Sequence, residues 1–221
     1  VFDNIKLSGN FSNNKSYLSW WNCKEDITDE ILSLVSCFEG KVFIDIPGKL
    51  SSSVNVKGRD RFVLDGCGNT ITIDNVAGAA INIVEVSDLE IKSIIFKYAG
   101  CDFGNEKNVQ AIRIEHGNIN SSVVVDNITI SDFDNHLFAP CGFDALLVEN
   151  CHNNTSTLIR NIVIKDIRVK GDGRELNGIG ANYGITITCH KSYSGKVRIN
   201  NCKLDNICNV DKTGKYVYED A

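Results

Sequence analysis

The stretch that decides the fold is VRINNCKLDN, residues 197–206. Its apolar residues alternate with polar ones at Val197 and Ile199, a polar pair follows, and the alternation resumes at Cys202 and Leu204. A period of two is typical of a β-strand, because successive side chains of a strand point to opposite faces. The polar pair shifts the alternation by one residue, so the chain can turn a corner while its apolar side chains stay inside. We therefore expect two short strands joined at a corner.

Copies of this phrase recur upstream, at residues 62–67, 89–96, 128–133 and 162–169. The residues that we take as equivalent are Leu64, Ile91, Ile130, Ile164 and Ile199. Their separations are 27, 39, 34 and 35 residues, a spacing that indicates stacked repeat units. We predict that the four isoleucines stack as one buried column. The column beside it would contain Ile94, Phe133, Ile167 and Cys202.

Polar residues with turn-forming side chains mark the corner in each copy. They are Ser93, Asp132, Asp166 and Asn201. Side chains of this kind close turns by bonding to nearby backbone groups. We interpret them as a ladder along one corner of the molecule rather than as a row of catalytic aspartates.

A second set of strands precedes each copy. It comprises AINIV (80–84), AIRIE (111–115), ALLVE (145–149) and GITIT (184–188). The equivalent residues Ile83, Ile114, Val148 and Ile187 are 31, 34 and 39 apart, in agreement with the first set. Stacking at least two strands per repeat buries a continuous aliphatic core. The predicted fold class is all-β, a parallel β-helix over residues 49–221, preceded by an N-terminal strand and helix cap over residues 1–48.

The segment before the repeats contains one helical pattern. Thr28 is followed by Asp29 and Glu30 and then by apolar residues at helical spacing, which predicts a helix capped by Thr28 and ended by Gly40. A strand over residues 41–46 follows. Such a helix would cover the open apolar end of the first rung. No comparable cap follows the last strand phrase, and we expect further sequence or a neighbouring subunit there.

Composition narrows the classes of partner. The net charge of -5, without a basic stripe, argues against nucleic acid and anionic membranes, and nothing resembles a membrane span or a signal peptide. The nine cysteines and four histidines lack metal-ligand spacing, so we expect no metal and no cofactor. Cys67 and Cys202 fall at expected core positions, which favours reduced thiols in a protein assembled in the cytoplasm.

Residues 18–68 carry a resemblance to a known superfamily. The matching residues are Trp20, Trp21, Asp26, Thr28, Asp29, Gly40, Val42, Ile44, Ile46, Pro47, Gly48, Leu64, Gly66 and Gly68. Their order resembles the start of the pectate-lyase-like β-helix superfamily, as found in bacteriophage tailspikes and polysaccharide depolymerases. The resemblance implies a right-handed coil, a homotrimer, a virion, extracellular or bacterial cell-surface location, and a bacterial surface polysaccharide as ligand. Other virion proteins would be further partners.

Three long inserts precede the second set of strands, at residues 98–110, 135–144 and 170–184. All three occur at the same point of the repeat, so we expect them to form one wall of a groove. The inserts supply candidate substrate-binding residues, namely Asp102, Phe103, Phe143, Asp144 and Tyr183. Further acids in the inserts are Glu106, Asp172 and Glu175. The alternative is that the aromatic side chains pack against their own loops.

Glu115 and Glu149 are the candidate catalytic pair. Both follow the inward residue of their strand, so they should point outward on adjacent rungs, roughly 4.8 Å apart. Two neighbouring carboxyl groups can divide into an acid and a base, as glycoside hydrolysis requires. Arg113, two residues before Glu115, would bind an acidic sugar. The alternative is a solvated acidic face in which Arg113 is a counterion.

Two functions agree with these observations. The first is a tailspike-like protein that recognises a surface polysaccharide and that, if it is an enzyme, cleaves it as a hydrolase or lyase. The second is a non-catalytic structural or adhesive β-helix. The N-T-D, D-D and G-H-G motifs of polygalacturonases are absent, which favours the second function. The acidic and aromatic inserts favour the first.

Overall fold

The computed structural model describes residues 15–21, 23–38, 40–103, 108–117, 119–139, 141–152, 154–170, 182–189, 196–211 and 213–215. The elements in chain order are β1 (Lys15–Tyr17), the 3-10 helix η1 (Leu18–Trp20), α1 (Thr28–Cys37), β2 (Gly40–Phe43), β3 (Gly48–Leu50), β4 (Val54–Asp65), β5 (Thr70–Asp74), β6 (Ala79–Gly100), β7 (Asn108–Glu115), β8 (Ser121–Asp134), β9 (Gly142–Cys151), β10 (Thr155–Lys170), β11 (Asn182–Cys189) and β12 (Lys196–Val210). Within this part of the chain no helix is long and apolar enough to span a membrane.

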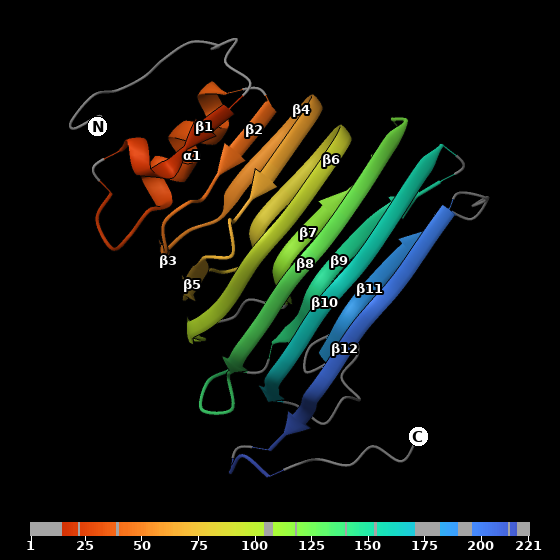
Figure 1. Ribbon diagram of the computed structural model, residues 1–221. Helices are drawn as coiled ribbons and strands as arrows, with labels where there is room; N and C mark the ends of the chain where they lie inside the picture. Colours follow the sequence, from red (N-terminus) through yellow and green to blue (C-terminus); the bar gives the residue numbers. More distant parts are fainter. Residues whose placement is uncertain are drawn as a thin grey trace.

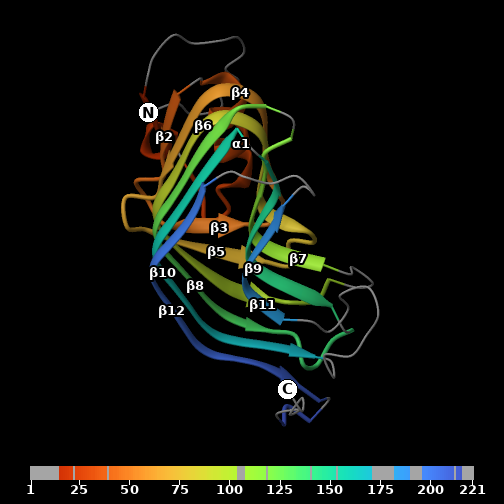
Figure 2. The ribbon, with the colours of Figure 1, turned by 90° about the vertical axis from the view of Figure 1, so that its right-hand side faces the viewer.

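The strands stack into a coil with two main sheet faces. One face contains the bent strands β8, β10 and β12, and the other contains β7, β9 and β11 (Figures 1 and 2). The long strand β6 contributes to both faces, because its first residues pair with β7 and its later residues pair with β8. All of these pairings are parallel, and the chain winds in a right-handed sense as it advances from β6 to β12 (Figure 1). The fold is therefore an all-β, right-handed parallel β-helix.

The predicted register of the second strand set is confirmed. Ile83 is paired with Ile114, Ile114 with Val148, and Val148 with Ile187. Ile83, Ile114 and Val148 are buried in the hydrophobic core, as period-two alternation requires.

The predicted column of four isoleucines is wrong. Ile91 is paired with Val125, and this column continues through Ile159 to Ile199. Ile130 and Ile164 belong to a second column, between Phe96 and Leu204. Ile91 and Ile199 precede the first bend of their strands, whereas Ile130 and Ile164 lie between the first bend and the second. A similar apolar phrase precedes each bend, so the sequence alone does not separate the two positions.

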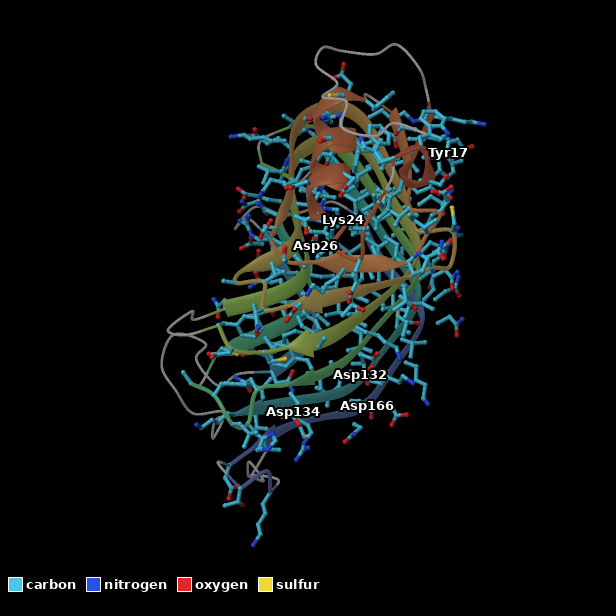
Figure 3. The ribbon with its side chains drawn as sticks, turned by 90° about the vertical axis from the view of Figure 1, so that its left-hand side faces the viewer. Tyr17, Lys24, Asp26, Asp132, Asp134 and Asp166 are labelled. Atoms are coloured by element: carbon cyan, nitrogen blue, oxygen red, sulfur yellow. The ribbon has the colours of Figure 1, made fainter. Side chains whose placement is uncertain are left out.

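The two bends are built by residues in the left-handed region of backbone conformation. One corner contains Ser93, Asn127, Asn161 and Asn201, and the next contains Asp132, Asp166 and Asn206. Side chains bond along each corner: Asn201 Nδ2 donates to Asn161 Oδ1 at 2.7 Å, and Asn206 Nδ2 donates to Asp166 Oδ1 at 2.9 Å. Figure 3 shows Asp132 and Asp166 projecting from the outer surface. Turn residues line the corners as expected, but the predicted single ladder is wrong, because Ser93 and Asn201 lie at one corner and Asp132 and Asp166 at the other.

Helix α1 closes the N-terminal end of the stack (Figure 1). Ile31 and Leu34 are fully buried in the same core as the first rungs. The predicted cap is wrong in its residue, because Thr28 is the first residue of the helix and Ile27 occupies the N-cap position. Asp26 Oδ1 accepts hydrogen bonds from the backbone and hydroxyl of Thr28, at 3.0 and 2.6 Å. At the other end of the helix, Arg59 donates to the carbonyl oxygens of Phe38 and Val35.

The C-terminal end of the stack is open among the described residues. Ile199 and Leu204 are 48% and 54% exposed, although Ile159 and Ile164 in the same two columns are fully buried. The inward side chains of the last rung therefore lie on the surface of this end.

The cysteines divide between the core and the surface, and all nine are free thiols. Cys67 is exposed at a corner with a φ of 53°, so its predicted core position is wrong. Cys202 is half-buried and is paired with Ile162, which places it in the column of Ile94 and Ile128 rather than in that of Phe133.

Candidate functional site

The sheet of β7, β9 and β11 places Glu115 and Glu149 side by side. The two residues are register partners on neighbouring strands, and both side chains are 27% exposed. This adjacency follows from the outward position that both residues take in the strand alternation, and it was predicted from the sequence.

Arg113 connects the two carboxylates. Its Nη2 lies 2.7 Å from Glu115 Oε2, its Nε lies 2.5 Å from Glu149 Oε2, and its Nη1 donates to Asn82 Oδ1 at 3.0 Å. The guanidinium thus supplies one positive charge to two carboxylates, which offsets their mutual repulsion. This arrangement agrees with the interpretation of Arg113 as a counterion.

The cluster extends along the axis of the coil. Asn82 Nδ2 on β6 donates to Asn55 Oδ1 on β4 at 2.8 Å, so planar polar side chains continue over four strands that follow one another in the sheet. We call Asn55, Asn82, Arg113, Glu115 and Glu149 the outer polar row. It runs across the strands, in the direction in which the rungs stack.

Asp144 lies on the same sheet as the outer polar row, near the start of β9. It is paired with Gln110 on β7 and with Tyr183 on β11, and it accepts a hydrogen bond from the hydroxyl of Thr186. Burial raises the pKa of the Asp144 carboxyl above its ordinary value, and the charge of Glu149 adds to this effect, while hydrogen bonds from Thr186 and Gln110 oppose it. The environment of Asp144 therefore favours its protonated form.

The aromatic candidates lie in different environments. Phe143 and Phe103 are buried, and their ring centroids lie 4.1 and 5.8 Å from that of Phe133. They pack against Phe133 of β8 within the core, rather than against their own loops, and they offer no ring face to a sugar. Tyr183, in contrast, is 53% exposed. It is the aromatic candidate whose ring a ligand can reach.

The remaining insert residues contribute less to this site. Asp102 is exposed, and its backbone N–H donates to Asn75 Oδ1 at 2.8 Å. Glu106, Asp172 and Glu175 lie outside the described residues, as does most of the third insert. The predicted groove wall is therefore described only in part. Over the described positions, no three His, Cys, Asp or Glu side chains form a group that could hold a metal ion.

A further cluster was not predicted. Nδ1 of His136 lies 2.5 Å from Asp134 Oδ1, and Nη1 of Arg168 lies 2.9 Å from Asp134 Oδ2. Asp134, at the end of β8, projects from the outer surface (Figure 3). An Asp–His pair at the end of a strand was the available signal. Metal-ligand spacing does not detect such a pair.

Searches of protein-family models, of curated proteins and of solved structures found no match to this chain.

Proposed function

We propose that this chain is a tailspike-type β-helix that binds a bacterial surface polysaccharide on the outer face of β7, β9 and β11. The outer polar row is the observation that carries the proposal. It offers donors and acceptors on successive rungs, in the direction that an extended polymer would follow along the coil.

The chemistry of the row suits sugar hydroxyl groups. Asn side chains offer both donors and acceptors, carboxylates accept from paired hydroxyls, and the Arg113 guanidinium presents several donors in one plane. Tyr183, exposed on β11 beside Asp144, adds an aromatic surface with an apolar face on which a sugar ring can stack. Sites of this kind combine a few positioned polar groups with apolar contacts.

The tailspike type and the homotrimer are parts of the same proposal. Their support is the resemblance of residues 18–68 to the start of such proteins, together with the β-helix fold. Exposed apolar residues at the C-terminal end, Ile199 and Leu204, favour association with another chain. Light scattering on the full chain tests this part. The expected result is a trimeric mass, and a monomer at micromolar concentration would contradict it.

Binding is tested with a panel of purified capsular polysaccharides and lipopolysaccharides. We expect the native protein to bind at least one member, and Arg113→Gln to weaken that binding by at least tenfold. Arg61→Gln is the matched control, because Arg61 on β4 forms an exposed ion pair with Asp88 on β6, at 3.3 Å. Equal affinity of the Arg113 and Arg61 variants would place the binding site elsewhere.

Cleavage of the bound polymer is the second candidate function. Adjacency of Glu115 and Glu149 favours it, but Arg113 pairs with both, so Asp144 is the better candidate for the acid. A reducing-end assay with Asp144→Asn and Glu149→Gln tests the assignment. If the protein cleaves the polymer at this site, each substitution should lower the turnover rate by about two or more orders of magnitude, as expected for the loss of a positioned acid or base. Full activity in both variants would exclude these residues.

A further inference from the structure

Two cysteines occupy partner positions at the ends of neighbouring strands. Cys151 is the last residue of β9, Cys189 is the last residue of β11, and the parallel pairing of these strands sets the two opposite each other. Neighbouring strands lie about 4.8 Å apart. This spacing falls within the range of about 4.4–6.8 Å between Cα atoms that a disulfide spans.

The two side chains are close enough to influence each other: burial raises the pKa of the Cys151 thiol, and the neighbouring Cys189 side chain raises it further. Cys151 is fully buried, whereas Cys189 is one of two exposed cysteines, the other being Cys67. One sulfur of the pair is thus open to a reagent in solution, and its neighbour is held beside it inside the protein.

We propose that Cys151 and Cys189 are a redox-sensitive pair that forms a disulfide and fastens β11 to β9. In the presence of oxidised glutathione, the Cys189 thiolate attacks one sulfur of the glutathione disulfide and releases one reduced glutathione. The Cys151 thiolate then attacks the Cys189 sulfur of the mixed disulfide and releases the second. Two protein thiols are oxidised, one glutathione disulfide is reduced, and the two thiol protons leave with the released glutathione molecules.

The second step should be the slower one. Burial raises the pKa of the Cys151 thiol to about 11, so its reactive thiolate form is scarce near neutral pH. Closure of the disulfide should therefore accelerate as the pH rises, and the mixed disulfide at Cys189 should accumulate first.

The location gives the disulfide a structural effect. Among the described strands, β11 is paired only with β9, and Ile185 and Ile187 on β11 are only partly buried. A covalent bond at the end of β11 would hold this strand to the better-packed rung below it. Thiols kept reduced in the cytoplasm would then close into a disulfide once the protein reaches an oxidising environment.

Thiol counting and peptide mapping on the full chain test the proposal. The Cys67→Ser background removes the other exposed thiol. In it, treatment of the folded protein with oxidised glutathione should lower the free thiols from eight to six and yield a peptide that joins Cys151 to Cys189. The thermal midpoint should rise on oxidation and return after reduction with dithiothreitol.

The control is Cys189→Ser in the same background. It changes an exposed side chain, and its seven remaining thiols should stay free. A stable glutathione adduct on Cys189 without the Cys151 cross-link would overturn the proposal. A Cys189 cross-link between two chains, or eight unreacted thiols in the Cys67→Ser protein, would also overturn it.

Discussion

Two polar clusters lie on opposite faces of the sheet at the end of β7. Comparing them distinguishes polar side chains that the fold requires from those that can bind a ligand. Glu115 points outward into the outer polar row, whereas the next residue, His116, points inward and is 1% exposed. Nδ1 of His116 is hydrogen-bonded to the Ser121 hydroxyl, and its Nε2 lies 3.0 Å from the Thr157 hydroxyl. We call His116, Ser121 and Thr157 the inner polar cluster.

The difference between the clusters is access to water. A polar group of the inner cluster that loses its partner stays buried and unpaired, which is costly. In the outer polar row, water can replace a lost partner, because the side chains of Arg113, Glu115 and Glu149 are 27–28% exposed. The inner cluster is therefore needed for stability. The outer row can be changed at little cost to the fold, so its side chains remain available for recognition.

The largest expected effect is on stability at acidic pH. Burial, with a smaller contribution from the charge of His152, lowers the pKa of His116 from 6.5 to about 4. Between these values the unfolded chain binds a proton that the folded chain excludes, so stability is retained above pH 6.5 and falls as the pH drops towards 4. The loss is about 3 kcal/mol, at about 1.4 kcal/mol per pH unit. Denaturant unfolding at a series of pH values measures it.

The control for this prediction is His116→Gln, which removes the titrating group. The pH dependence between 6.5 and 4 should become flatter by the same amount. Asp144 acts in the opposite direction, because its raised pKa favours the folded state as the pH falls, but it contributes equally to both proteins. Identical pH profiles of the native protein and the variant would contradict the inward placement of His116.

The second-largest effect on stability is expected when one hydrogen bond of the inner polar cluster is removed without changing the volume of the side chain. Thr157→Val keeps the volume of the buried side chain but removes the hydroxyl that faces His116 Nε2. The free energy of unfolding should fall by roughly 1–3 kcal/mol, the cost of an unpaired buried polar group. Urea denaturation provides the measurement, and a change below about 0.5 kcal/mol, as for an ordinary surface site, would mean that the cluster is not buried.

A smaller effect is expected at the corners, where exposed polar residues are required by the backbone. Asn161 has a φ of 56°, a left-handed conformation that most side chains disfavour. Asn161→Ala should cost about 1–2 kcal/mol in backbone strain. Asn161→Gly loses the same side-chain contacts without that strain and should be less destabilising. The opposite ranking would show that the side-chain ladder, rather than backbone conformation, determines the choice of residue.

The smallest effect is expected in the outer polar row. Glu115→Gln and Glu149→Gln retain the shape of the side chains, and each should change the free energy of unfolding by less than about 0.5–1 kcal/mol, as for partly exposed ion pairs. Thermal or chemical denaturation of the two variants checks this. A loss comparable to that of Thr157→Val would mean that the row is required by the fold.

The sequence predicted the repeat architecture well, because the core residues of a β-helix strand occupy every second position of the sequence. The column of Ile83, Ile114 and Val148 and the adjacency of Glu115 and Glu149 both followed from that pattern. The column through Ile91 did not, because similar apolar phrases precede the two corners at Asn127 and Asp132.

The site was less predictable than the fold. Alternation does not extend into the inserts, so the sequence could not distinguish the buried rings of Phe103 and Phe143 from the exposed ring of Tyr183. The contact between Asp134 and Arg168 depends on the pairing of β8 with β10. The spacing of residues within either strand does not indicate this contact.

The central claim is that the outer polar row binds a polysaccharide and is not required by the fold. Isothermal titration of the best ligand from the panel, into the Glu115→Gln/Glu149→Gln protein and into Thr157→Val, tests it most directly. We predict that the double variant loses at least tenfold in affinity while its stability changes little, and that Thr157→Val keeps its affinity while losing stability. Native affinity in the double variant, or no binding of any panel member by the native protein, would contradict the claim.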